Sequence, residues 1–108
     1  RLIVSDDGST DETLTKIRCA FDGYQDRLFV ITRRAHGCGI VQNFSDALAA
    51  STADYVFLAD QDDVWLPQKL MNLFLSLKKL EGDEKFPSVV YSDLEVVDRD
   101  LRPLADSW

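Results

Sequence analysis

The segment 55–67 constrains the fold of this chain more than any other stretch. It opens with an uninterrupted apolar run, residues 55–59, and continues with three acids, Asp60, Asp62 and Asp63. A short apolar run bounded in this way is typical of a strand buried on both faces, as in a parallel sheet. Ligands of open parallel sheets bind beyond the carboxyl ends of the strands. The sequence therefore predicts a metal or a charged substrate beside Asp60 and Asp62.

The rest of the chain alternates between strand and helix patterns. Apolar runs predict further strands at residues 2–5, 27–32 and 88–94, with a short edge strand over 95–97. Apolar positions spaced by three and four residues predict helices over about residues 10–22, 41–51 and 66–80. Ser9 and Glu12 have the spacing of a capping box at the start of the first helix. This alternation implies an α/β fold with a mostly parallel sheet.

Length and charge limit the classes of protein that fit. At 108 residues the chain is one domain or part of one. A net charge of −7 argues against nucleic acid as a partner, because phosphate contacts need a basic surface. No apolar run approaches the roughly 18 residues of a membrane span, and no signal peptide is visible. Cys19 and Cys38 form no metal-ligand spacing and are expected to be incidental thiols in a reducing compartment.

Two acidic clusters, Asp6–Asp7 and Asp60–Asp63, each follow a predicted strand. If the strands run parallel, both clusters lie at one edge of the sheet, where the carboxylates repel one another unless a cation is present. Mg²⁺ or Mn²⁺, held by one or two carboxylates and by phosphate oxygens, is a common solution. The alternative is that these acids cap helices and form turns, since aspartate is favoured in both places.

Three classes of reaction place acids at strand ends. A receiver domain would use an acidic pair and Asp60 as phosphoacceptor, but it needs a late lysine, and none follows Lys85. A haloacid-dehalogenase-type phosphatase would use Asp60 as nucleophile and Asp62 as acid/base, and it leaves the Asp6–Asp7 pair unexplained. A non-catalytic α/β binding module also remains open. The third reaction class, sugar transfer, accounts for both clusters.

Four segments carry the resemblance to that class: LIVSDDGSTD at residues 2–11, VQNFSDAL at 41–48, DYVFLADQDDVWLPQKL at 54–70 and VYSD at 90–93. The residues of these segments, and the order of the segments along the chain, closely resemble those of family 2 glycosyltransferases with the GT-A fold. ADQDDVW, at residues 59–65, looks most like the rhamnosyltransferase-type branch. The resemblance covers most of the chain, so residues 1–108 are expected to be part of one GT-A domain, truncated at both ends.

The resemblance also implies roles for particular residues. Asp7, with Asp6 beside it, would read the nucleotide base or ribose, and Asn43 would anchor the glycine-containing loop near the nucleotide. Asp60 would lie against the nucleotide, and Asp62 would bind the divalent cation on the diphosphate. That cation would neutralise charge on the leaving diphosphate.

The reaction implied is sugar transfer, with inversion, from a nucleotide-diphosphate donor to a hydroxyl of a saccharide or lipid-linked acceptor, in cell-surface polysaccharide synthesis. The family's catalytic base lies beyond the matching region, so no catalytic residue is assigned and the fragment is expected to be inactive alone. Arg33 and Arg34 are candidates for phosphate contact, with a solvated loop role as the alternative. We expect a cytoplasmic enzyme, with the inner face of the membrane as the second possibility.

Overall fold

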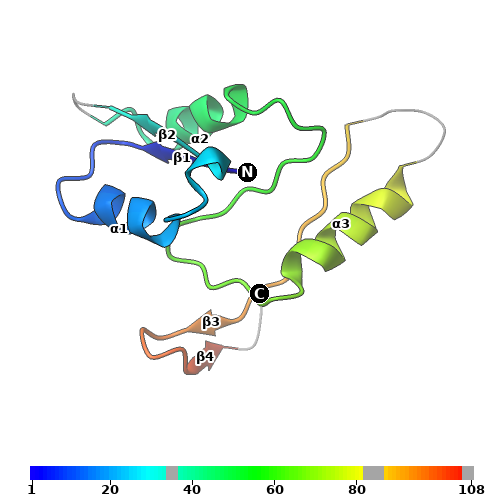
Figure 1. Ribbon diagram of the computed structural model, residues 1–108. Coiled ribbons are helices and arrows are strands. Elements are labelled where there is room, and N and C mark those ends of the chain that lie inside the picture. Colours follow the sequence, from blue (N-terminus) through cyan, green and yellow to red (C-terminus); the bar gives the residue numbers. More distant parts are fainter. Residues whose placement is uncertain (34–36, 82–86, 106–108) are drawn as a thin grey trace. The chain divides into compact units, whose positions relative to one another are not determined.

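The computed structural model describes residues 1–33, 37–81 and 87–105 (Figure 1). The chain divides into two compact units, Arg1–Val56 and Phe57–Trp108. The elements of the first unit are β1 (Leu2–Asp6), α1 (Thr13–Ala20), the 3₁₀ turn η1 (Gln25–Arg27), β2 (Leu28–Thr32) and α2 (Ile40–Ala49). Those of the second are α3 (Lys69–Leu80), β3 (Val96–Val97) and β4 (Pro103–Ala105).

The first unit is built on a parallel strand pair. β1 and β2 run in register, with Leu2 opposite Leu28 and Asp6 opposite Thr32. Packing of α2 against β1 half-buries strand residues such as Val4. The two helices lie on opposite sides of the strand pair (Figure 1). The predicted α/β fold with parallel strands is confirmed here, and both strands and α2 begin and end within two residues of their predicted bounds.

The start of α1 differs from the prediction. The helix begins at Thr13, and its N-cap residue, Glu12, makes no side-chain capping bond. Asp11 Oδ1 accepts the Thr13 N–H at 3.0 Å, while the carboxylate of Asp6 accepts the N–H of Ser9 at 3.2 Å. The expected capping box was therefore wrong, because the helix begins after Glu12 and the Ser9 N–H, which Glu12 would accept, is bound by Asp6 instead.

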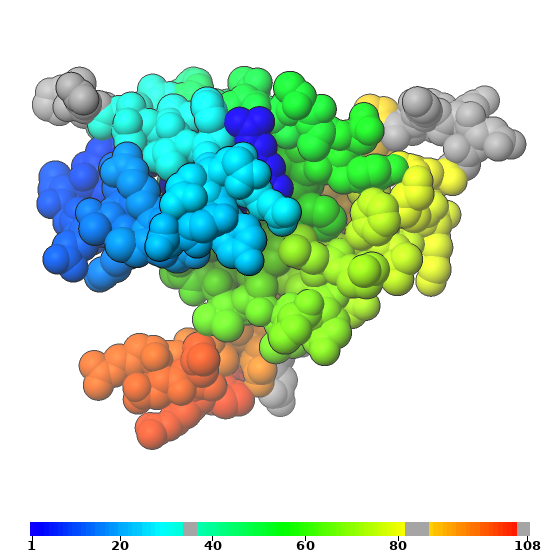
Figure 2. Space-filling model, in the orientation of Figure 1, coloured from blue at the N-terminus to red at the C-terminus, as the bar shows by residue number. Residues whose placement is uncertain are grey.

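The second unit contains α3 and an antiparallel hairpin of β3 and β4. The α3 helix confirms the predicted helix, although it begins at Lys69 rather than Leu66. Its side chains are largely exposed, as Figure 2 shows for the yellow-green segment. The short edge strand predicted over 95–97 is confirmed by β3. In the hairpin turn, Leu101 adopts a left-handed backbone conformation with φ of 61°.

Two predicted strands are not formed. Residues 55–59 and 88–94 are assigned to no strand, and Val56 and Leu58 are exposed. The first of these segments is also divided between the two units. An apolar run reports a tendency to be buried, whereas a strand requires a hydrogen-bonded neighbour, and β1 and β2 pair with each other.

Burial is unusual in this chain. Among the residues that the structure describes, Asp6 is the buried one, with 7% of its surface exposed, and no apolar side chain is buried to that degree. Large apolar side chains on α2 are open to solvent, with Ile40 and Val41 the most exposed. No helix in the described ranges has the length and apolarity needed to cross a bilayer.

Candidate functional site

A groove of about 540 Å³ opens at the carboxyl end of β1 and β2, within the first unit. The turn after β1, the helix α1 and the loop after β2 supply its walls. Polar side chains dominate the lining, and they include Asp6, Asp7, Ser9, Arg18, Thr32 and Arg33. This edge is where open α/β sheets bind ligands, so the groove is the first candidate for a binding site.

Asp6 shapes the turn at the groove's floor. Its carboxylate accepts the backbone N–H of Gly8 at 3.3 Å and that of Ser9 at 3.2 and 3.3 Å. Gly8 has a φ of +99°, which lets the chain turn back over the carboxylate. The Asp6 carbonyl also accepts the N–H of Arg33 at 3.2 Å. A buried carboxylate requires such donors, and these fix the turn that carries the next aspartate.

Asp7 connects β1 to the loop before α2. Its carboxylate accepts the Cys38 N–H at 2.8 Å, the Cys38 thiol at 3.0 Å and the Gly39 N–H at 3.1 Å. The backbone hydrogen bond from Cys38, followed by that from its thiol, lowers the pKa of Asp7. The same thiol–carboxylate bond raises the pKa of Cys38. Asp7 is thus held as a charged acceptor, and the expectation that Cys38 is incidental was wrong.

The loop approaches Asp7 so closely at Gly37 that a larger residue there would displace the Asp7 carboxylate. A Cβ on Gly37 would lie 2.9 Å from Asp7 Oδ2, closer than non-bonded atoms normally come. Gly39, with a φ of +83°, is the N-cap of α2, and its carbonyl accepts the N–H of Asn43 at 3.0 Å. Asp7 therefore sits at the amino end of α2, where the helix dipole favours a negative charge.

Asn43 holds α2 against β1. Its side-chain Nδ2 donates to the Ser5 carbonyl at 2.9 Å, and the Ser5 hydroxyl donates to Asn43 Oδ1 at 2.5 Å. Both polar atoms of the amide are engaged within the protein. These bonds join α2 to β1, and the anchoring of the glycine-containing loop near a nucleotide by Asn43 stays a prediction.

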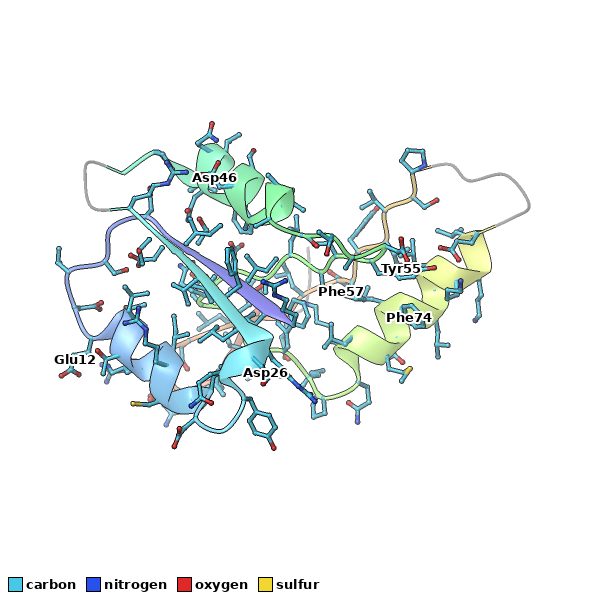
Figure 3. The ribbon with its side chains drawn as sticks, turned by 45° about the horizontal axis from the view of Figure 1, so that its top comes forward. Glu12, Asp26, Asp46, Tyr55, Phe57 and Phe74 are labelled. Carbon is cyan, nitrogen blue, oxygen red and sulfur yellow. The ribbon has the colours of Figure 1, made fainter. Side chains whose placement is uncertain are left out.

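A second contact to α2 comes from Arg33, directly after β2. The guanidinium forms an ion pair with Asp46, which projects from α2 (Figure 3). Arg33 Nε lies 4.0 Å from Asp7 Oδ1. This Nε atom is buried and makes no hydrogen bond to any residue that the structure describes. Sequence reasoning missed Asp46, although it lies one helical turn after Asn43 and on the same face.

Asp60, Asp62 and Asp63 lie in the second unit, around a turn at residues 61–62, and all three are exposed. Within the described ranges, no three His, Cys, Asp or Glu side chains lie together so as to hold a metal. Two carboxylates nevertheless suit Mg²⁺ or Mn²⁺, because these ions take the rest of their ligands from phosphates and water. The donor set at Asp60 and Asp62 therefore fits a metal that arrives with a diphosphate.

The structure places some of the predicted site residues in the first unit and the others in the second. Asp6 and Asp7 lie at the carboxyl end of β1 and Asn43 bonds Ser5 just before them, whereas Asp60 and Asp62 lie in the other unit. The prediction that both acidic clusters follow strands of one parallel sheet was wrong for Asp60–Asp63, because residues 55–59 form no strand. Arg34 lies outside the described residues.

Comparison with known proteins gives one match. The family model described as glycosyl transferase family 2 matches residues 1–105, a span that includes both acidic clusters. Neither the curated proteins nor the solved structures yielded a match.

Proposed function

The chain belongs to glycosyl transferase family 2, and we propose that its groove binds the nucleotide part of a nucleotide-diphosphate sugar. Family membership makes it a glycosyltransferase domain, which takes a sugar donor and an acceptor. One observation supports the groove in particular: a charged Asp7, fixed by the loop before α2, borders a cavity at the carboxyl end of two parallel strands.

We assign Asp7 to a hydroxyl or N–H of the nucleotide, with Asp6 acting through the turn that it organises. Each carboxylate oxygen has about two acceptor positions, and those of Asp7 already accept from Cys38 and Gly39. The Cys38 thiol is the weakest of these donors. A ribose hydroxyl would replace the thiol at lowest cost and leave the backbone bonds intact. Asn43 contributes by holding α2, and with it this loop.

We assign Asp62 to the divalent cation and Asp60 to the nucleotide beside it. When bound, Mg²⁺ or Mn²⁺ would supply Lewis-acid neutralisation of the leaving diphosphate. Asp62 and Asp60 are both exposed, which leaves their carboxylates accessible to an ion carried by the donor. No residue of the chain is assigned as catalytic base.

The finer features of the reaction are proposals that depend on sequence resemblance alone. They are inversion at the anomeric carbon, a rhamnosyltransferase-like specificity suggested by residues 59–65, a saccharide or lipid-linked acceptor, and a role in polysaccharide synthesis at the inner face of the membrane. The phosphatase and the non-catalytic module gain no support from the family match.

Nucleotide affinity with and without metal tests the proposal. Calorimetry with uridine, guanosine and thymidine diphosphates, with and without Mn²⁺, should show metal-dependent binding that Asp62→Ala removes. Asp26→Ala, an exposed acid in η1, is the matched control and should bind like the wild type. An affinity indifferent to both Mn²⁺ and Asp62→Ala would exclude the metal role. Absence of binding to all three nucleotides would contradict the proposed function.

A further inference from the structure

The ion pair between Arg33 and Asp46 has no part in the function proposed above, yet its arginine lines the groove. Arg33 follows β2, and Asp46 belongs to α2. Their side chains retain 31% and 26% of their exposure, so the pair is only partly shielded from water. Partly exposed ion pairs contribute little to folding stability. Its main effect is therefore expected on the position of the guanidinium.

Both ends of this contact are fixed by other bonds. The Arg33 backbone N–H donates to the Asp6 carbonyl at 3.2 Å, which continues the strand pairing by one residue. Asp46 Oδ1 accepts from Gln42 Nε2 at 2.7 Å, which leaves Oδ2 for the guanidinium. The helix itself is held one turn earlier, at Asn43. Asp46 is thus a carboxylate with a set position and one oxygen directed to Arg33.

This arrangement leaves one buried guanidinium nitrogen without a hydrogen-bond acceptor among the described residues. Arg33 lines the groove, and its buried Nε makes no hydrogen bond within the described part of the chain. Asp7 Oδ1 lies 4.0 Å from this nitrogen, and the oxygens of Asp7 already accept from the loop. A buried donor without an acceptor is costly, and an oxygen of a bound ligand would satisfy it.

We propose that Asp46 is a positioning residue for donor binding. Asp46 holds the Arg33 guanidinium in one orientation, so that its Nε–H remains at the groove wall beside Asp7 and meets a hydroxyl or phosphate oxygen of a nucleoside diphosphate. The proposal depends on the proposed function of the groove. Without Asp46, the arginine side chain would recover its rotamer freedom, and binding would have to restrict that freedom again.

The first experiment needs no ligand. In ¹H–¹⁵N spectra of the intact chain, the Arg33 Nε–H should give a resolved signal with slow solvent exchange. Asp46→Asn should shift it towards the position of free arginine, and Asp46→Glu should restore it in part. The control Asp26→Asn changes the net charge equally and should leave the signal unchanged. An unaltered Arg33 signal in Asp46→Asn would overturn the positioning role, whatever the nucleotide result.

The second experiment measures nucleotide affinity and thermal midpoint together, with uridine, guanosine and thymidine diphosphates as probes. Asp46→Asn is expected to weaken binding about tenfold, the factor that corresponds to roughly one lost charge-assisted contact. Arg33→Lys keeps a positive charge for Asp46 but has no Nε, so it should retain the thermal midpoint and lose the same affinity.

The outcomes distinguish the positioning role of Asp46 from the proposed binding of a nucleotide in the groove. Wild-type affinity in Arg33→Lys, or in Asp46→Asn, would refute the inference while the proposed function stands. If the wild type binds none of the nucleotides, the proposed function fails, and the Arg33 Nε–H signal still decides whether Asp46 fixes the guanidinium.

Discussion

Replacing Asn43 tests whether one side chain fixes α2 to the end of β1. Asn43→Ala removes two hydrogen bonds, from Nδ2 to the Ser5 carbonyl at 2.9 Å and from the Ser5 hydroxyl to Oδ1 at 2.5 Å. Ser5→Ala removes only the second. A net hydrogen bond contributes about 1 kcal/mol, so we expect losses of about 2 kcal/mol for Asn43→Ala and about 1 kcal/mol for Ser5→Ala.

The double variant measures the coupling free energy between Ser5 and Asn43 directly. Because Ser5 and Asn43 share one of the two bonds, the double variant should lose about 2 kcal/mol rather than the sum of about 3 kcal/mol, a coupling of roughly 1 kcal/mol. Urea unfolding followed by circular dichroism measures each free energy of unfolding. Ser45→Ala is the control, because the Ser45 hydroxyl bonds the Val41 carbonyl within α2 and is exposed.

Additive losses of stability in the Ser5 and Asn43 variants would refute the idea that the two side chains bond each other. If the two single losses sum to the double loss within about 0.3 kcal/mol, the side chains do not share an interaction. A loss in the Ser45→Ala control as large as that in Asn43→Ala would show that α2 is sensitive to any polar deletion. Nucleoside-diphosphate affinity should fall in Asn43→Ala as well, since α2 carries the loop that holds Asp7.

Four further predictions concern the loop and the hairpin. Gly37→Ala would place a Cβ 2.9 Å from Asp7 Oδ2, so the Asp7 pKa should rise towards its ordinary value in a ¹³C-detected titration and nucleotide affinity should fall. Because hydrogen bonds from Cys38 lower the pKa of Asp7, their contribution to stability is present above the ordinary value of about 3.9 and lost as pH falls through the folded-state pKa. Urea midpoints of the wild type and Asp7→Asn should therefore converge below that pH. The same bond raises the pKa of Cys38, so iodoacetamide should alkylate it more slowly than the exposed Cys19 at mildly alkaline pH, and Asp7→Asn should accelerate it. Leu101→Asn should stabilise the hairpin by about 1 kcal/mol in urea unfolding, since asparagine tolerates the left-handed backbone that costs leucine roughly that much.

The sequence predicted the elements whose signals are local. The β1, β2 and α2 elements each have an unbroken apolar run or a clear helical period, and the structure forms all three close to their expected bounds. The runs at 55–59 and 88–94 carry an equally strong apolar signal, but a strand depends on a partner elsewhere in the chain. The sequence of the run does not encode that partner.

The candidate site, like the fold, could be predicted from the sequence only in part. Parallel strands bring their carboxyl ends together, so Asp6 and Asp7 beside the loop before α2 could be predicted from topology. Their individual contacts could not, because they depend on backbone N–H groups whose directions are set only after folding. Cys38 is the clearest case, since neither its spacing nor its neighbours distinguish it from Cys19.

Polar contacts, rather than apolar burial, determine the geometry of this groove. The described residues include no buried apolar side chain, yet α2 contacts the strand ends at three places. They are the Ser5–Asn43 pair, the carboxylate of Asp7 at the helix start, and the Arg33–Asp46 ion pair. Apolar packing tolerates sliding, whereas hydrogen bonds and paired charges require particular distances and angles. Variants at Asp46 should therefore change ligand affinity more than stability, whereas variants at Asn43 should lower both.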